Sequence, residues 1–314
     1  MPHRPVAGRT GELGCDIKIK RRPCNIRRSR GIELRSLPGI RRRTLVQLGR
    51  ASLATALWLY AGFSHAHDPV FGLVPHTLFK GGTEVHGGYA RAEAGAEREQ
   101  EYALAASYGL TADWTVGLEQ HFADVSAPGN KRSGRGDVAL QSKYRFLRQD
   151  LPGAQRAAAL ALRLVLGGSG ERELANEGAT DAIVGWSYGY EGRRWYRWAA
   201  APYRRNAEND AGFKRGDVWL LDLAGGLRFH PSGYFEPDWV WMLELNGELI
   251  DRAQTNGNTV VASGGQRWFV SPGLMLTYRN YALKTGVQIP ISQNLNGAQD
   301  KIDYRGVVEI EGHF

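Results

Sequence analysis

The feature that most constrains this chain is a period-two alternation of side chains that recurs along most of its length. Residues 114–122, WTVGLEQHF, place Trp114, Leu118 and Phe122 on one face and small or polar residues on the other. Residues 239–249, WVWMLELNGEL, repeat the pattern. Such alternation predicts β-strands with one apolar face. We expect about twelve strands, near residues 82–91, 101–110, 114–125, 136–147, 155–167, 179–190, 194–205, 215–229, 237–250, 265–278, 281–292 and 301–314.

The segments between these predicted strands are alternately long and short. The short ones carry turn residues, as in Thr-Ala-Asp at 111–113 and Arg-Asn at 279–280, whereas the long ones are rich in Gly, Asn, Asp and Ser. Each strand is close to the length that a tilted membrane-spanning strand needs. The pattern predicts an all-β fold, a transmembrane antiparallel up-and-down β-barrel with short periplasmic turns and longer outer loops. An even number of strands places both ends of the barrel chain on the periplasmic side.

Aromatic residues gather at one end of the predicted strands, next to the short turns. A general preference of aromatic residues for strand ends does not explain this one-sidedness, whereas an aromatic girdle at one membrane interface does. The predicted girdle consists of Tyr108, Trp114, Phe146, Trp195, Phe229, Trp239, Tyr278, Tyr281 and Phe314.

A soluble β-sandwich is the main structural alternative, because its strands also alternate between a polar and an apolar face. The predicted strands are longer than the five or six residues that are usual in soluble sheets. Their polar face also contains many small residues, such as Ala103, Gly117 and Gly185, which suit the crowded inside of a barrel. Both observations favour the barrel.

The N-terminal part of the chain differs from the rest in composition. The chain has a formal net charge of +8, and the excess of arginine lies before residue 67, as do Cys15 and Cys24. We therefore expect no nucleic-acid partner. A basic segment, a short apolar stretch and Ser64-His65-Ala66 indicate a secretory signal peptide. We expect four parts: an extension that is not native at 1–44, the signal peptide at 45–66, a periplasmic segment or plug at 67–81, and the barrel at 82–314.

Several segments carry a resemblance to a known family. They are YGLTADWTVGLE (108–119), GRGDVALQSKYRF (134–146), RGDVWLLDLAGGLRF (215–229) and the terminal aromatic residue. With them the chain resembles Gram-negative outer-membrane β-barrels, and more narrowly the outer-membrane transporter family named after the MetA pathway of phenol degradation. The resemblance implies passage of small molecules across the outer membrane, hydrophobic or aromatic ones among them. It implies no cofactor.

The charged residues of the predicted strands alternate with apolar ones, so they are expected to line the barrel lumen. A charge that faces lipid costs roughly 2–4 kcal/mol near the membrane midplane. Two interpretations stay open: an electrostatic pore lining, or a salt-bridge network that closes a structural or adhesive barrel. The predicted lining comprises Glu119, His121, Lys143, Arg145, Arg163, Asp222, Arg228, Glu244, Arg305, Glu309 and Glu311, with Arg197 and Arg205 also expected to point inward.

Two further kinds of chemistry have candidate residues in the sequence, catalysis on lipid and metal binding. An outer-membrane enzyme acting on lipid would need a nucleophile and a general base near the membrane. His121 is the candidate base, with Glu119 on the same face of the strand. No G-x-S-x-G motif is present. His67 and His76 are weak candidates for a metal site, because they lack the short spacing of known ligand pairs. We expect the protein not to be an enzyme.

The chain ends in mid-strand, with YRGVVEIEGHF at 304–314. This predicts a last strand that closes on the first, near residues 82–91, with Phe314 in the periplasmic girdle. In this class of protein a terminal aromatic residue resembles the signal read by the barrel-assembly machinery. The expected partners are therefore outer-membrane lipids, that machinery and a small-molecule solute. Nothing in the sequence marks a subunit interface.

Overall fold

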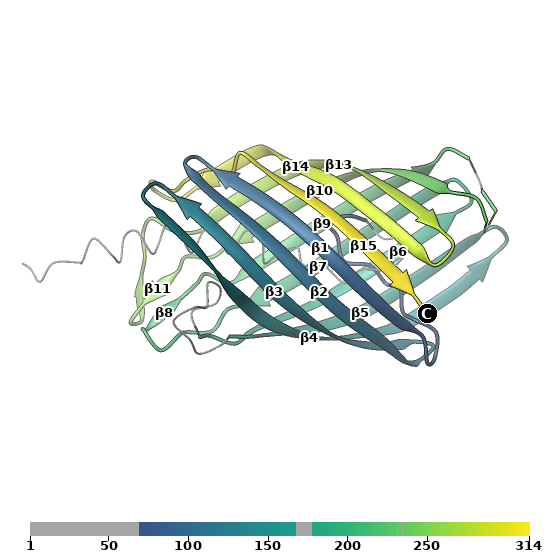
Figure 1. Ribbon diagram of the computed structural model, residues 1–314. Helices are drawn as coiled ribbons and strands as arrows, with labels where there is room; N and C mark the ends of the chain where they lie inside the picture. The colour runs from purple at the N-terminus through teal and green to yellow at the C-terminus, as the bar shows by residue number, and fades with distance from the viewer. Residues whose placement is uncertain (1–68, 168–177, 231, 234) are drawn as a thin grey trace, which may run out of the picture. The chain divides into compact units, whose positions relative to one another are not determined.

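The structure, a computed structural model, describes residues 69–167, 178–230, 232–233 and 235–314. The predicted extension, the signal peptide and His67 lie outside the described residues. Within the described residues, twelve strands form a closed antiparallel barrel (Figure 1). The barrel strands are β1 (Thr83–Ala94), β2 (Glu97–Thr111), β3 (Trp114–Ala127), β4 (Asn130–Leu151), β5 (Ala154–Leu166), β6 (Asp181–Gly192), β7 (Trp195–Arg205), β9 (Val218–Arg228), β10 (Asp238–Ile250), β13 (Gly265–Tyr278), β14 (Tyr281–Leu295) and β15 (Tyr304–His313). The predicted twelve-stranded antiparallel barrel is confirmed.

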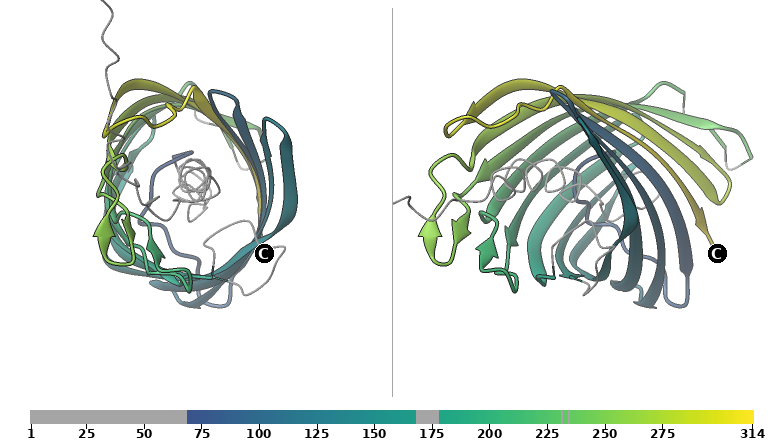
Figure 2. Two further views of the ribbon diagram at one scale, coloured as in Figure 1. Left: turned by 90° about the vertical axis from the view of Figure 1, so that its left-hand side faces the viewer. Right: turned by 60° about the vertical axis from the view of Figure 1, so that its left-hand side comes forward.

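Each strand pairs with its neighbours along the chain, and β15 pairs with β1 to close the ring (Figure 2). At this seam Glu84 lies opposite His313 and Tyr89 opposite Val308. The backbone N–H of Phe314 donates to the carbonyl oxygen of Thr83, and the reverse bond has the same 2.8 Å length. The terminal residue therefore completes the pairing of the last strand with the first.

The predicted alternation of long and short connections is wrong at two places. The β1–β2 and β3–β4 connections, expected to be long, are tight turns at residues 95–96 and 128–129. Gly95 and Gly129, with φ of 57° and 73°, supply the left-handed backbone that these turns need. The strands β2 and β4 extend further than the alternation indicated, because a strand that leaves the lipid no longer requires an apolar face. Three short strands, β8 (Phe213–Lys214), β11 (Gln254–Thr255) and β12 (Asn258–Thr259), pair in the longer loops.

The outer surface of the barrel is apolar. Leu104, Trp241, Leu243, Ile289 and Ile310 are each largely exposed, and they alternate with buried polar residues on the same strands. In water such a continuous apolar surface is unfavourable, whereas lipid covers it. Among the described residues, no helix is long and apolar enough to cross a membrane. All nine predicted girdle residues are exposed and lie at the short-turn ends of their strands.

Candidate functional site: the barrel lumen

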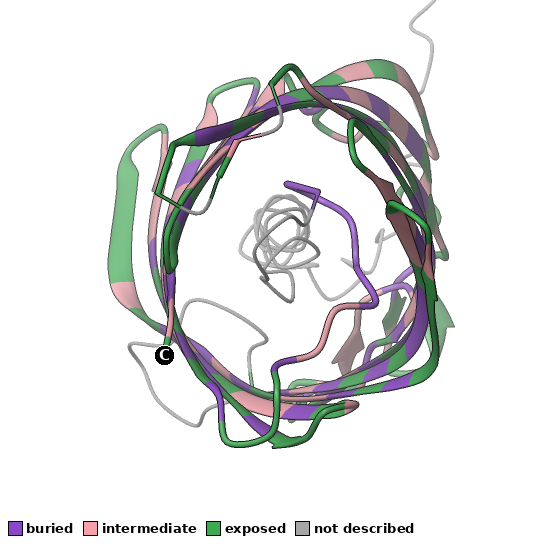
Figure 3. Ribbon diagram, turned by 90° about the vertical axis from the view of Figure 1, so that its right-hand side faces the viewer, coloured by how far each residue is buried: buried purple, intermediate pink, exposed green. Residues whose placement is uncertain are grey.

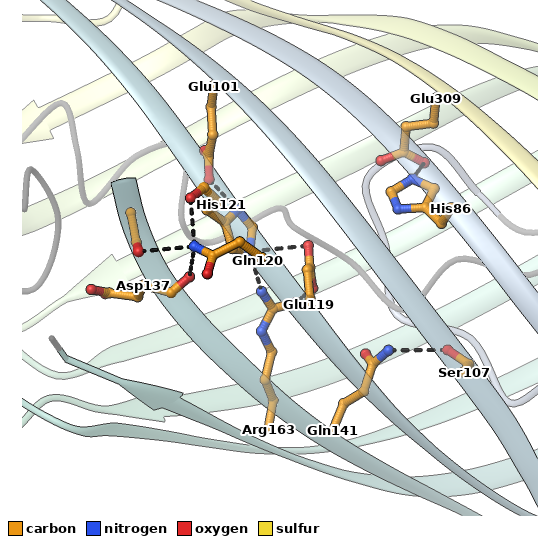
Figure 4. A network of polar contacts seen from close by, with 11 residues as sticks. His86, Glu101, Ser107, Glu119, Gln120, His121, Asp137, Gln141, Arg163 and Glu309 are labelled. Atoms are coloured by element: carbon orange, nitrogen blue, oxygen red, sulfur yellow. Dashed lines mark hydrogen bonds and ion pairs between the residues drawn. The ribbon is translucent and has the colours of Figure 1, made fainter. Parts of the chain in front are cut away.

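Polar side chains from β2, β3 and β5 meet in a buried group on the lumen wall (Figure 4). His121 lies between two carboxylates, with Nδ1 in contact with Glu101 and Nε2 3.0 Å from Glu119. Arg163 Nη1 is 2.8 Å from the second oxygen of Glu119. Glu119 and His121 share a face because they are two positions apart on one strand. We call these four residues the histidine cluster.

A second charged group lies at the seam of β14, β15 and β1. Lys284 Nζ is 3.4 Å from Glu309 and 3.3 Å from Glu311, and His86 Nε2 is 3.7 Å from Glu309. Together with the histidine cluster, these ion pairs form a wall that we call the charged wall. Its side chains are buried, so each charge depends on its neighbours rather than on water.

Further toward the long-loop end, Arg305 pairs with Glu248 and donates to Gln288 Oε1 over 3.2 Å. Asn246 donates to Asp222 over 2.9 Å. Of the eleven predicted lining residues, ten are buried and Arg228 is half-buried. Arg145 and Arg228 lie at the short-turn rim. There Arg145 pairs with Asp113 at 2.8 Å and Arg228 with Asp238 at 2.7 Å.

The prediction that Arg197 and Arg205 point inward is wrong. Both side chains are exposed, and Tyr196, Trp198 and Arg204 occupy the inward positions of β7. The alternation fails here because β7 begins with tryptophans on both faces, so its sequence does not reveal which face meets lipid. Arg197 and Arg205 lie near the two ends of β7, where a lipid-facing charge costs little.

Sequence reasoning also missed an apolar region on the inside of the barrel. Tyr196 and Trp198 stack with ring centroids 5.4 Å apart, and Val240, Met242 and Met275 join them in one buried cluster. These residues lie at the short-turn ends of β7, β10 and β13. We call them the apolar seat. Two consecutive inward apolar positions on each strand, Tyr196 and Trp198 on β7 and Val240 and Met242 on β10, were the available signal.

The segment from Pro69 to Leu78 occupies the lumen and packs on the apolar seat. Figure 3 shows it, mostly buried, inside the ring of strands. Val70, Phe71 and Val74 belong to the same cluster as the seat. Glu244 accepts hydrogen bonds from the backbone N–H groups of Val70, at 2.6 Å, and Phe71, at 3.2 Å. We call residues 69–78 the lumen segment.

Two glycines in the wall make room for this segment. A Cβ atom at Gly273 would lie 2.8 Å from Val70 Cγ2, and one at Gly286 would lie 2.9 Å from the Phe71 ring. Both distances are shorter than ordinary contacts, so larger residues would displace the segment. At its other end, Leu78 N–H donates to Thr115 Oγ1 over 2.9 Å, and Thr77 donates to the carbonyl of Ala112.

A small cavity remains between the lumen segment and the charged wall. Its lining includes Phe71, His86, Glu101, His121 and Arg305. Its volume of about 40 Å³ is room for only a few water molecules. The lumen segment therefore fills the space beside the charged wall except for this small cavity.

The suggested metal pair is not formed by the described residues. His76 contacts Glu191, and His67 lies outside the described residues. Glu84, Glu311 and His313 place ligand atoms within 4.8 Å of one another, but Lys284 lies 3.3 Å from Glu311 and competes with a cation there.

A model of the family described as "Putative MetA-pathway of phenol degradation" matches residues 78–288. The chain belongs to this family. The match spans the barrel from the end of the lumen segment to β14. No curated protein matches the chain in sequence.

Solved structures share the fold of this family member. The COG4313 outer membrane channel from Pseudomonas putida F1 is 15% identical, with a TM-score of 0.59 over 79% of this chain and 99% of that one. A NanC porin is 12% identical, with a TM-score of 0.43 over 73% and 98% of the two chains. The likeness to the channel is one of fold, which is that of outer-membrane β-barrels.

Within this family fold, the position of His121 bears on the enzyme hypothesis. The side chain is fully buried on the lumen wall between Glu101 and Glu119. It faces away from the lipid, so it does not present a base to a membrane-embedded substrate. The arrangement suits an ion-pair role better than catalysis on lipid.

Proposed function

We propose that the protein is an outer-membrane channel for small apolar or aromatic molecules, and that the lumen segment acts as its plug. The apolar seat carries this proposal. Aromatic and aliphatic side chains on the inside of a barrel give an apolar solute favourable contacts that water cannot provide. A lumen lined only by polar side chains would not offer these contacts.

The lumen segment indicates how a solute gains access. Val70, Phe71 and Val74 cover the seat with side chains of the size and polarity of a small apolar molecule. An apolar solute can therefore replace these contacts when the segment leaves. The family's connection with phenol degradation agrees with an aromatic solute.

The experiment measures entry of a fluorescent aromatic probe into intact cells that make the protein, together with conductance in planar bilayers. Met242→Lys places a charge in the seat and should abolish probe entry, while ion conductance should rise because the lumen segment loses apolar contacts. Ser271→Lys, on the polar stretch of β13 beyond the seat, is the control. The proposal fails if cells take up the probe no faster than cells without the protein and bilayers show no conductance.

A closed structural barrel is a second candidate, because the lumen holds a dense set of buried ion pairs. The two proposals differ for a variant without residues 69–78. In that variant a channel should show higher ion conductance, whereas a barrel closed by ion pairs should show none.

A further inference from the structure

The outer surface of β5, β6 and β7 carries a row of side chains unlike the rest of the barrel. Arg156 lies opposite Tyr190, and Tyr190 lies opposite Arg197, on three adjacent strands. The guanidinium carbons of the two arginines are 5.9 Å and 5.7 Å from the centroid of the tyrosine ring. One aromatic ring thus holds two cations in fixed positions through cation–π contacts.

The row borders an open hollow between two neighbouring short turns. The hollow measures about 580 Å³, and its lining includes Gly153, Arg193, Arg194 and Trp195. Gly153 comes from the β4–β5 turn, whereas Arg193 and Arg194 form the β6–β7 turn. Arg193, Arg194 and Arg197 therefore line one outward-facing space, and Arg156 lies beside it across the ring of Tyr190. We call it the arginine hollow.

These four arginines have no carboxylate partner among the described residues. Arg194 donates to the carbonyl oxygen of Phe229 over 3.2 Å and keeps its full charge. The nearby acids are engaged elsewhere: Glu191 contacts His76, and Asp150 pairs with Arg148 at 3.3 Å. The positive charge of the hollow is therefore available to a ligand.

The hollow lies at the level of the aromatic girdle. Trp195, a girdle residue, lines it, and Arg197 is two positions along the same face of β7. Girdle residues sit at the depth of the lipid head groups. Arginine binds phosphate through paired N–H groups, and basic pockets at this depth suit anionic lipids.

We propose that the arginine hollow binds the phosphate of an anionic phospholipid in the membrane leaflet at the short-turn rim. Arg156, Arg193 and Arg197 bind the head group, and the exposed faces of Trp195 and Tyr190 contact its glycerol and upper acyl chain. The site lies outside the barrel and is independent of passage through the lumen.

Mass spectrometry of the intact protein in detergent tests the proposal, with the anionic lipid phosphatidylglycerol as the probe and phosphatidylcholine, a zwitterion with no net charge, as the comparison. The variant R156Q/R193Q/R197Q should bind phosphatidylglycerol at least tenfold more weakly than the unchanged protein. It keeps Arg194, whose side chain supports the turn. The control K131Q/R132Q/R135Q removes as many exposed charges from the opposite rim and should bind normally.

Equal binding by the triple variant and the unchanged protein would overturn the proposal. So would equal binding of the two lipids, or equally strong binding of glycerol phosphate without acyl chains, which would indicate a site for free phosphate. If the triple variant does not fold, R197Q alone should weaken phosphatidylglycerol binding at least threefold, and unchanged binding would refute the site.

Discussion

The charged wall and the apolar seat are built from the same kind of position, inward-facing residues of antiparallel strands, yet they are held in different ways. In the charged wall, partners such as Glu119 and Arg163 both belong to the sheet. In the apolar seat, Tyr196 and Met242 are covered by Val70 and Phe71, which belong to no strand. The wall is thus completed by the barrel itself, whereas the seat is completed by a segment that belongs to no strand of the barrel.

The lumen segment is held by a few polar contacts and by apolar packing. Glu244 binds its first residues, His76 contacts Glu191, and Thr115 and Ala112 bind its end. Val70, Phe71 and Val74 supply the apolar packing. A buried ion pair resists loss of either partner, because the remaining charge is left without water or a counter-charge. Apolar contacts are non-directional and can be exchanged for those of another apolar molecule. The comparison predicts that damage to the wall weakens the barrel, and damage around the seat opens it.

The largest effect is expected in the wall. Arg163→Met leaves Glu119 and His121 buried without the guanidinium, and breaking such a buried pair costs about 3–5 kcal/mol. The free energy of unfolding, measured by urea titration in lipid vesicles, should fall by that amount.

Arg205→Met is the matched control, because Arg205 is exposed at the end of β7. Its effect on the free energy of unfolding should stay within about 0.5 kcal/mol. Equal losses for the two variants would contradict the distinction between inward and outward arginines.

A smaller effect is expected where the lumen segment is attached. Glu244→Gln removes one of the two carboxyl oxygens that accept hydrogen bonds from the backbone of Val70 and Phe71. A buried donor left without its acceptor costs about 1–3 kcal/mol. The loss should destabilise docking of residues 69–78, so single-channel conductance and protease cleavage of the segment should both rise. Glu248→Gln, on the same face of β10 but bound to Arg305, is the control and should not increase cleavage. Unchanged cleavage in Glu244→Gln would show that the bonds from Glu244 do not hold the segment in place.

The smallest effect on stability is expected at the seam beside the charged wall. Deletion of Phe314 removes two backbone bonds to Thr83 and the ring contact with Tyr281. At about 0.5–1.5 kcal/mol for each hydrogen bond, the barrel should remain stable once folded. The amount that reaches the outer membrane should nevertheless fall, if the terminal aromatic residue directs assembly. Normal levels, measured by membrane fractionation, would refute that role.

The sequence was a good guide to the barrel because lipid imposes one rule on every strand. Residues such as Leu118 and Leu243 meet lipid while Glu119 and Glu244 face inward, so periodicity alone locates both faces. The same rule predicted the placement of the girdle, because Trp114 and Trp239 follow short turns.

The rule fails where both faces of a strand are apolar. In β7, Trp195 faces outward and Trp198 inward. Which alternate residues of β7 face the lumen therefore depends on packing against Phe71 and Met242, which are distant in sequence. The position of the lumen segment could not be read from its own residues either. Its apolar side chains predict only that the segment is buried. The space for Val70 and Phe71 is left by Gly273 and Gly286, which lie far away in the sequence.

A disulfide lock tests the central claim, that the lumen segment closes the channel by covering the apolar seat. A Cβ atom at Gly273 would lie 3.6 Å from Val70 Cβ, a distance that suits a disulfide. In the variant V70C/G273C, with Cys15 and Cys24 replaced by serine, oxidation should reduce conductance and aromatic-probe entry to background, and reduction should restore both. If the oxidised, fully cross-linked protein conducts and admits the probe as well as the reduced protein, the lumen segment is not the plug.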